Sequence, residues 1–154
     1  MNPPRATAPA LGDRTPIPAK HGIIRQINRV RVELIDALDR ELSTFDISAA
    51  QLIVLASVAN KEADSAAGLC KSISYDPGAM TRMIDRLEQK GLVRRLPNVE
   101  DRRATNLEIT TAGRALYPQL LAAKETVAAQ FLRGFSADEA DLLERFLDRM
   151  LDNR

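Results

Sequence analysis

Residues 76–95 read DPGAMTRMIDRLEQKGLVRR, and this stretch decides the fold. It opens with Asp-Pro-Gly, which is typical of a turn, and proline suits the first turn of a helix. Apolar residues then recur at the spacing of one buried helical face: Met80, Met83, Ile84 and Leu87. Gly91 marks the expected end of the helix, because glycine often follows a last helical turn. The LVRRL run after it predicts a β-strand.

The other side of this predicted helix is basic. Arg82, Arg86 and Lys90 are spaced by four residues and form one stripe, with Asp85 beside it. Small residues at the start of the helix would let its backbone approach a ligand, and a helix N-terminus favours phosphate. Residues 71–103 hold eight basic and five acidic side chains, although the whole chain carries a net charge of only +1. Taken alone, such a charge run is more often an ordinary solvated helix face. Its coincidence with a helix-turn-helix and a hairpin favours a nucleic-acid surface instead.

Three further helices are predicted upstream. Residues 17–42 carry apolar side chains every three to four positions, which indicates one long helix. Ser48 and Gln51 form a capping box at the start of AQLIVLASVAN, whose apolar composition predicts a deeply buried helix. A short helix is expected over residues 65–73.

Downstream of Gly91 the spacing of apolar residues changes from that of a helix to the alternation of a β-strand. LVRRL and TNLEIT flank the polar segment PNVEDRR, which predicts a two-stranded hairpin with a charged tip. Thr110 begins a long helix to about Gly134, and Pro118 should interrupt and kink it. Ser136 and Glu139 form a second capping box before a final amphipathic helix.

Three helices followed by a hairpin predict a winged helix-turn-helix over residues 48–110, in a fold that is otherwise mainly α. In such a motif the second helix, here the basic one, enters the DNA major groove. Residues 1–15 are expected to be a disordered arm, because five of the eight prolines lie in the first 18 residues. Residues 16–154 are expected to form a single domain.

Composition excludes several other classes. The single cysteine allows no internal disulfide, which favours a reducing, cytoplasmic location. No apolar run approaches about 18 residues, so no membrane-spanning helix is expected. With one histidine and one cysteine no His/Cys metal cluster of ordinary spacing can form, and no glycine-rich phosphate loop follows a strand. We therefore expect neither an enzyme nor a cofactor.

The chain resembles the MarR family of bacterial winged-helix transcriptional regulators. The resemblance rests on DPGAMTRMIDRLEQKGLVRR and on NVEDRRATNLEITTAGR. The second segment contains the family's D-x-R hairpin signature and its L-x-x-T-x-x-G pattern, at Asp101, Arg103, Leu107, Thr110 and Gly113. The resemblance covers about residues 20–152.

This resemblance implies a homodimer that binds double-stranded DNA at a pseudo-palindrome. Its interface would be formed by the terminal helices, residues 17–44 and 111–152. It also implies roles for individual residues. Those expected to face bases or their flanking phosphates are Pro77, Gly78, Ala79, Thr81 and Arg82. Arg86 would lie on the DNA backbone, and Arg103 would enter the minor groove with Asp101 holding it in place.

The resemblance further implies a ligand-responsive repressor. Its effector would be a small anionic or aromatic compound bound between the dimer helices and the DNA-binding lobe. His21 and Arg25 are candidate lining residues, and the alternative is a solvated or dimer-interface pair. Gly68 stands where many members have an acidic residue, so its helix is expected to be short or mobile. Cys70, the only cysteine, is interpreted as core packing rather than a redox sensor.

A second hypothesis remains open at this stage. The chain could be a dimeric winged-helix interaction module that no longer reads DNA. A module without DNA would have no physical reason to keep Thr81, Arg82, Arg86 and Arg103 together.

Overall fold

The computed structural model describes residues 22–63, 65–73, 75–98 and 105–153. Its elements are, in order, α1 (Ile23–Leu42), the 3-10 turn η2 (Ser43–Phe45), α2 (Ala49–Ala59), α3 (Ala66–Ile73), α4 (Pro77–Gln89), β1 (Val93–Pro97), β2 (Thr105–Ile109), α5 (Thr111–Phe131) and α6 (Ala137–Asp152). This order confirms the mainly helical fold with one antiparallel hairpin. The arm expected at residues 1–15 lies outside the described residues.

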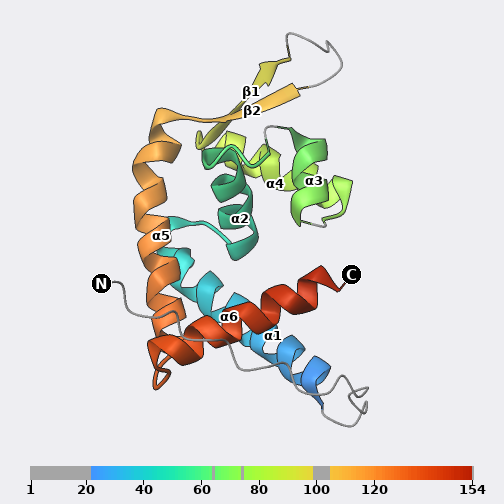
Figure 1. Ribbon diagram of the computed structural model, residues 1–154. Helices are drawn as coiled ribbons and strands as arrows, with labels where there is room; N and C mark the ends of the chain where they lie inside the picture. Colours follow the sequence, from blue (N-terminus) through green and yellow to red (C-terminus); the bar gives the residue numbers. More distant parts are fainter. Residues whose placement is uncertain (1–21, 64, 74, 99–104, 154) are drawn as a thin grey trace, which may run out of the picture.

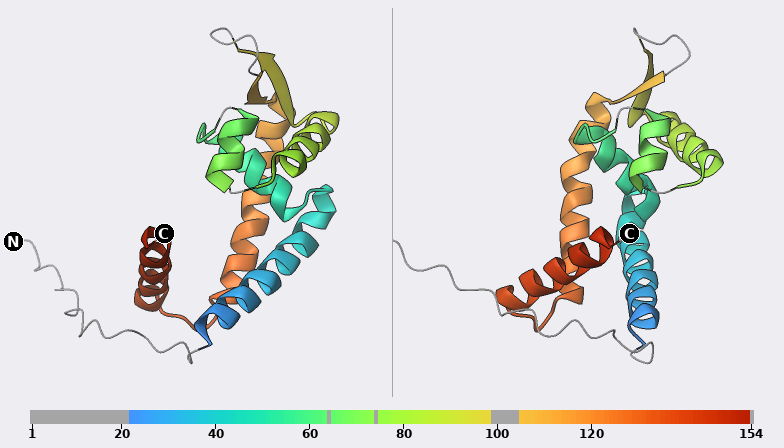
Figure 2. Two further views of the ribbon diagram at one scale, coloured as in Figure 1. Left: turned by 90° about the vertical axis from the view of Figure 1, so that its right-hand side faces the viewer. Right: turned by 45° about the vertical axis from the view of Figure 1, so that its right-hand side comes forward.

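The elements form a lobe and a base (Figure 1). In the lobe α2, α3 and α4 pack together, and the β1–β2 hairpin extends from one end. From the hairpin α5 runs down to the base, where it packs against α1. Figure 2 shows from two further sides that α6 stands apart from the lobe.

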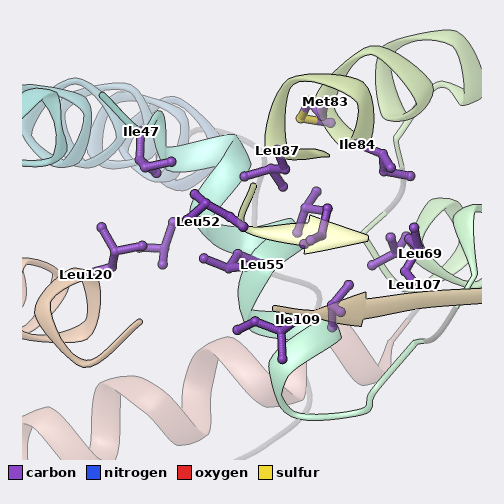
Figure 3. Packing of buried hydrophobic residues seen from close by; sticks show 14 of the residues in the cluster. Ile47, Leu52, Leu55, Leu69, Met83, Ile84, Leu87, Leu107, Ile109 and Leu120 are labelled. Atoms are coloured by element: carbon purple, nitrogen blue, oxygen red, sulfur yellow. The ribbon is translucent and has the colours of Figure 1, made fainter. Parts of the chain in front are cut away.

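The core of the lobe lies between α4, α2, α3 and the hairpin (Figure 3). The predicted buried face of α4 is confirmed, since its four apolar residues are at most 9% exposed: Met80, Met83, Ile84 and Leu87. Leu55 of α2 and Leu69 of α3 are fully buried in the same cluster. Most of α2 is buried as predicted, although Ile53 is exposed. The basic side of α4 is therefore the side that the core leaves free.

Both predicted capping boxes are present. Ser48 Oγ accepts a hydrogen bond from the Gln51 backbone N–H at 3.2 Å, and the Ser48 N–H donates to Gln51 Oε1 at 3.0 Å. Ser136 and Glu139 form the same pair of bonds at the start of α6, at 3.2 and 2.8 Å. Each box satisfies backbone donors that have no partner within the helix.

Ser48→Ala should lower the free energy of unfolding by about 1 kcal/mol, because it removes the cap of a buried helix. Ser43→Ala is the matched control, since its hydroxyl lies in an exposed turn and should change stability by less than about 0.5 kcal/mol. Urea denaturation monitored by circular dichroism measures both. Equal losses in the two variants would contradict the capping role.

The junction between the hairpin and α5 explains the L-x-x-T-x-x-G pattern. Thr110 Oγ1 donates to the Gly91 carbonyl at 2.5 Å and accepts from the Gly113 N–H at 3.0 Å. A Cβ on Gly113 would lie 2.2 Å from the carbonyl oxygen of Leu92 and 2.7 Å from a side-chain carbon of Ile109. Only glycine lets α5 start this close to the segment that links α4 to β1. The hairpin is thereby held against the lobe.

Two other features differ from expectation or refine it. α5 runs without a break through Pro118, so the expected interruption is wrong. Proline has no N–H, so Pro118 cannot donate to the carbonyl of Arg114. α3 is short, with eight residues. A Cβ on Gly68 would lie 3.2 Å from Ser65 Oγ and 3.3 Å from the Ala63 Cβ. Glycine at this position therefore makes room for the start of the helix, where Ser65 Oγ accepts the Gly68 N–H.

Among the described residues no single helix is both long and apolar enough to cross a membrane. The segments Ile23–Phe45 and Ala49–Ala59 reach that length and composition only as a pair bent by 76°.

Candidate nucleic-acid interface

The N-terminus of α4 is capped by Asp76. Its Oδ1 atom accepts the Ala79 N–H at 2.9 Å, and Pro77 occupies the first helical turn. A Cβ on Gly78 would lie 3.1 Å from Asp76 Oδ1, so glycine leaves room for this carboxylate. Pro77 and Gly78 are exposed and Ala79 is half-buried. Because the carboxylate already occupies this helix end, the N-terminus of α4 is a weaker phosphate site than the sequence alone indicates.

The exposed side of α4 presents Thr81, Arg82 and Arg86. Thr81 Oγ1 donates to the Pro77 carbonyl at 2.9 Å, which leaves its lone pairs facing outward as acceptors. Within the described part of the chain, neither Arg82 nor Arg86 forms an ion pair. Two unpaired guanidinium groups on one helix face are suited to a polyanion, and their forked donors match phosphate and guanine.

Lys90, the third residue of the predicted basic stripe on α4, has another role. Lys90 Nζ pairs with the carboxylate of Asp46 and with its backbone carbonyl. Asp46 lies in the turn before α2, in a left-handed conformation with φ of 55°. The prediction that Lys90 extends the stripe is wrong, because its charge is neutralised by a residue 44 positions away. Its side chain instead joins α4 to the end of the base helix α1.

A cavity of about 370 Å³ lies beside this contact. It is lined by residues of α4 and of the α1–α2 junction: Asp39, Ser43, Asp46, Ile47, Ser48, Gln51, Arg86 and Lys90. Arg86 therefore sits at the edge of the exposed face, next to the base, whereas Arg82 lies nearer its middle.

Arg95 of β1 contacts two carboxylates of α4. Its guanidinium donates to Asp85 Oδ1 at 2.5 Å and to Glu88 Oε2, and its backbone N–H donates to Glu88 Oε1 at 3.2 Å. The hydrogen bond to Asp85 raises the pKa of Arg95 above its ordinary value. Partial burial opposes this shift, and Glu88 adds to it. Arg95 is not among the residues predicted from the sequence to have a role, although the alternation of strand β1 is the signal that places its side chain towards α4.

The hairpin carries further ion pairs. Its register pairs Arg94 with Glu108, and the Arg94 guanidinium donates to Glu108 Oε2 at 2.8 and 2.6 Å. Arg114 at the start of α5 lies 4.0 Å from the other oxygen of Glu108. Asp101 and Arg103, the residues expected at the tip of the hairpin, lie outside the described residues.

The remaining candidate residues are those proposed for the effector pocket and the single cysteine. Arg25 is exposed near the start of α1, and His21 lies outside the described residues. Cys70 is partly buried and packs against the core, consistent with a packing role. Among the described side chains, no group of three His, Cys, Asp or Glu residues is placed to hold a metal ion.

Comparison with known proteins agrees with this architecture. Residues 47–105 match the model of the MarR family. The multiple antibiotic resistance protein MarR of Escherichia coli strain K12 is 36% identical over 130 residues, which are 84% of this chain and 88% of that protein. The HTH-type transcriptional repressor MdtR of Bacillus subtilis strain 168 is 29% identical over 111 residues, covering 72% of this chain and 69% of MdtR.

Solved structures show the same fold. A crystal structure of a mutant E. coli MarR complexed with operator DNA superimposes with a TM-score of 0.78, at 36% identity, and covers 85% of this chain and 94% of that one. The transcriptional regulator SlyA, at 23% identity, supports the fold alone, with a TM-score of 0.78 over 85% of this chain and 92% of SlyA. The 36% identity to E. coli MarR, over 84% of this chain and 88% of that protein, establishes the family membership, and the winged lobe with its exposed basic helix agrees with it. This chain therefore belongs to the MarR family.

Proposed function

We propose that the protein is a transcriptional repressor that binds a pseudo-palindromic DNA operator as a homodimer and releases it when a small effector binds. Members of the MarR family are transcriptional regulators rather than enzymes. The observation that carries the proposal is the exposed face of α4, on which Arg82 and Arg86 have no ion-pair partner in the described part of the chain. A relative of the same fold has been solved in complex with operator DNA, which supports DNA as the ligand.

In this proposal α4 enters the major groove. The residues that face bases or flanking phosphates are Pro77, Gly78, Ala79, Thr81 and Arg82. Arg86, at the edge of the face, lies against the DNA backbone. Arg103 enters the adjacent minor groove, where a narrow A·T-rich groove attracts arginine, and Asp101 holds it in place.

The homodimer is supported by apolar surface that the protomer does not cover. None of the residues of α6 is buried, and its exposed apolar side chains form one stripe: Leu142, Leu143, Phe146, Leu147, Met150 and Leu151. α1 exposes Ile23, Ile24, Val30, Val32 and Leu34. A 16-residue helix without tertiary packing is marginal in water. A second copy that packs against α6 and α1 would bury the α6 stripe and apolar side chains of α1.

The test is selection of duplexes by the immobilised full-length protein from a library of random double-stranded sequences. We expect enrichment of an inverted repeat whose half-sites are about 10 base pairs apart, one turn of DNA. If binding does not depend on sequence, or if no duplex is retained at low salt, the regulator assignment fails. The interaction-module hypothesis would then be the better account.

The effector response is tested on the selected duplex with a panel of aromatic carboxylates and phenols. We expect one or more of these to weaken DNA binding. α5 runs from the lobe to the base and packs there against α1, so a ligand wedged between the base and the lobe would change the separation of the two α4 helices. His21→Ala and Arg25→Ala should each raise the effector concentration needed for release by about ten- to a hundredfold, the effect of losing one charged hydrogen bond of about 1.5–3 kcal/mol.

Arg29→Ala is the matched control, since it removes another exposed arginine of α1. It should leave the response unchanged. If His21→Ala and Arg25→Ala respond to every active compound as the parent does, the pocket lies elsewhere.

A further inference from the structure

The position of Asp85 on α4 makes its partner important for DNA binding. At about 100° per residue, Asp85 lies about 60° from Arg82 around the helix, and side chains three positions apart are neighbours. A carboxylate at this position is close enough to form an ion pair with Arg82 along the helix. In the structure it does not, because Asp85 pairs with Arg95 of β1 at 2.5 Å.

Glu88, the second carboxylate held by Arg95, is placed differently. It lies six positions from Arg82, which is about 9 Å along the helix axis and about 120° around it. It contacts both the guanidinium and the backbone N–H of Arg95. Glu88 therefore anchors Arg95, and Asp85 is the nearer of these two carboxylates to Arg82. In the structure the Arg82 guanidinium extends towards the start of α4, where its Nη1 lies 3.6 Å from the position of a Cβ on Gly78.

We propose that Arg95 is a positioning residue of the DNA interface: it holds the Asp85 carboxylate and thereby leaves the Arg82 guanidinium free for DNA. The inference rests on the proposed function, since it assigns a cause to the availability of the α4 face. Arg95 acts through Asp85 and not by contact with DNA. Its side chain is only about one third exposed and its donors are directed at α4.

Removal of the Arg95 side chain is expected to release Asp85. Without the guanidinium, Asp85 has no ion-pair partner in the described part of the hairpin, and Arg82 becomes its cationic neighbour on the helix. Arg82 must then break an ion pair with Asp85 before it can contact a base or a phosphate. The two released carboxylates also place negative charge beside the DNA, which weakens association with a polyanion.

The experiment measures affinity for the selected duplex by fluorescence anisotropy, with the full-length protein. Arg95→Ala should lower the affinity about tenfold, the effect of losing one arginine–base contact. Arg95→Ala combined with Asp85→Asn should recover most of this loss, because Arg82 is free again. Asp85→Asn alone should stay within about twofold of the parent, since Arg95 keeps Glu88 as a partner.

The matched control replaces the other carboxylate. Arg95→Ala combined with Glu88→Gln removes the same negative charge at a position that Arg82 cannot reach, and it should recover little. If Glu88→Gln rescues as well as Asp85→Asn, net charge explains the effect and the positioning role is refuted. If neither double variant rescues, Arg95 acts on the fold or on DNA directly, and the inference is equally refuted.

Two further measurements keep these outcomes distinct. The salt dependence of Arg95→Ala with Asp85→Asn should equal that of the parent, and a slope lower by about one unit would show that Arg95 itself neutralises a phosphate. Should Arg95→Ala fail to fold by circular dichroism, Arg95→Gln replaces it, because its amide still donates to Glu88 while leaving Asp85 unpaired. A parent protein that selects no duplex refutes the proposed function, whereas a parent that binds without the rescue refutes this inference alone.

Discussion

Phe146→Asp is expected to convert the protein into a monomer and to lower its affinity for the selected operator by at least about a hundredfold. Phe146 is 46% exposed in the protomer and lies in the middle of the apolar stripe of α6. In a dimer the new carboxylate would be buried without a partner, which is costly. A monomer would bind one half-site at a time and lose the gain of linked binding, which is about 10²–10⁴.

Light scattering at micromolar concentration measures the assembly, and the parent should give twice the chain mass of 17.0 kDa. Arg145→Asp is the matched control, because it places the same side chain on the polar face of α6. It should remain dimeric. A parent that is itself a clean monomer would remove the basis of both the dimer and the palindromic operator.

Arg82→Ala is expected to lower affinity mainly on the selected operator, by about 1–3 kcal/mol, and to reduce the preference over scrambled DNA. The reason is that its guanidinium lies on the exposed face of α4 without an ion pair to any described residue, and arginine matches the two acceptors of guanine. Arg103→Ala should behave differently. It should weaken binding most where the flanks are A·T-rich and leave the major-groove preferences in place.

Fluorescence anisotropy on operator, flank-altered and scrambled duplexes at several salt concentrations separates the two effects. Each variant should also lower the salt slope by up to about one unit. Arg133→Ala, in the turn after α5, is the control for a general loss of positive charge and should bind all three duplexes nearly as the parent does. The DNA-reading assignment fails if Arg82→Ala and Arg103→Ala bind every duplex as tightly as the parent.

Much of the fold follows from signals that are local in the sequence. The capping boxes at Ser48 and Ser136 each depend on two residues three positions apart, so the printed sequence was enough to locate the starts of α2 and α6. The buried face of α4 follows in the same way from helical periodicity. Because the exposed face is simply the remainder of the helix, the positions of Arg82 and Arg86 were also predictable. The stripe on α6 likewise indicated surface that one protomer cannot cover.

The ion-pair partners of the charged residues could not be predicted from such local signals. Lys90 has the spacing of the basic stripe, but the turn at Asp46 lies within its reach only after α2 has packed on α4. Gly113 was recognisable as part of the L-x-x-T-x-x-G pattern. The reason that glycine is required there is the Leu92 carbonyl, which comes close only when the hairpin closes. Asp85 looked like an interruption of a basic face until β1 placed Arg95 beside it. Sequence periodicity determines which face of a helix is exposed, because that depends on neighbours within one turn. Which charges on that face remain free depends on side chains brought together from distant segments, and only the tertiary structure decides it.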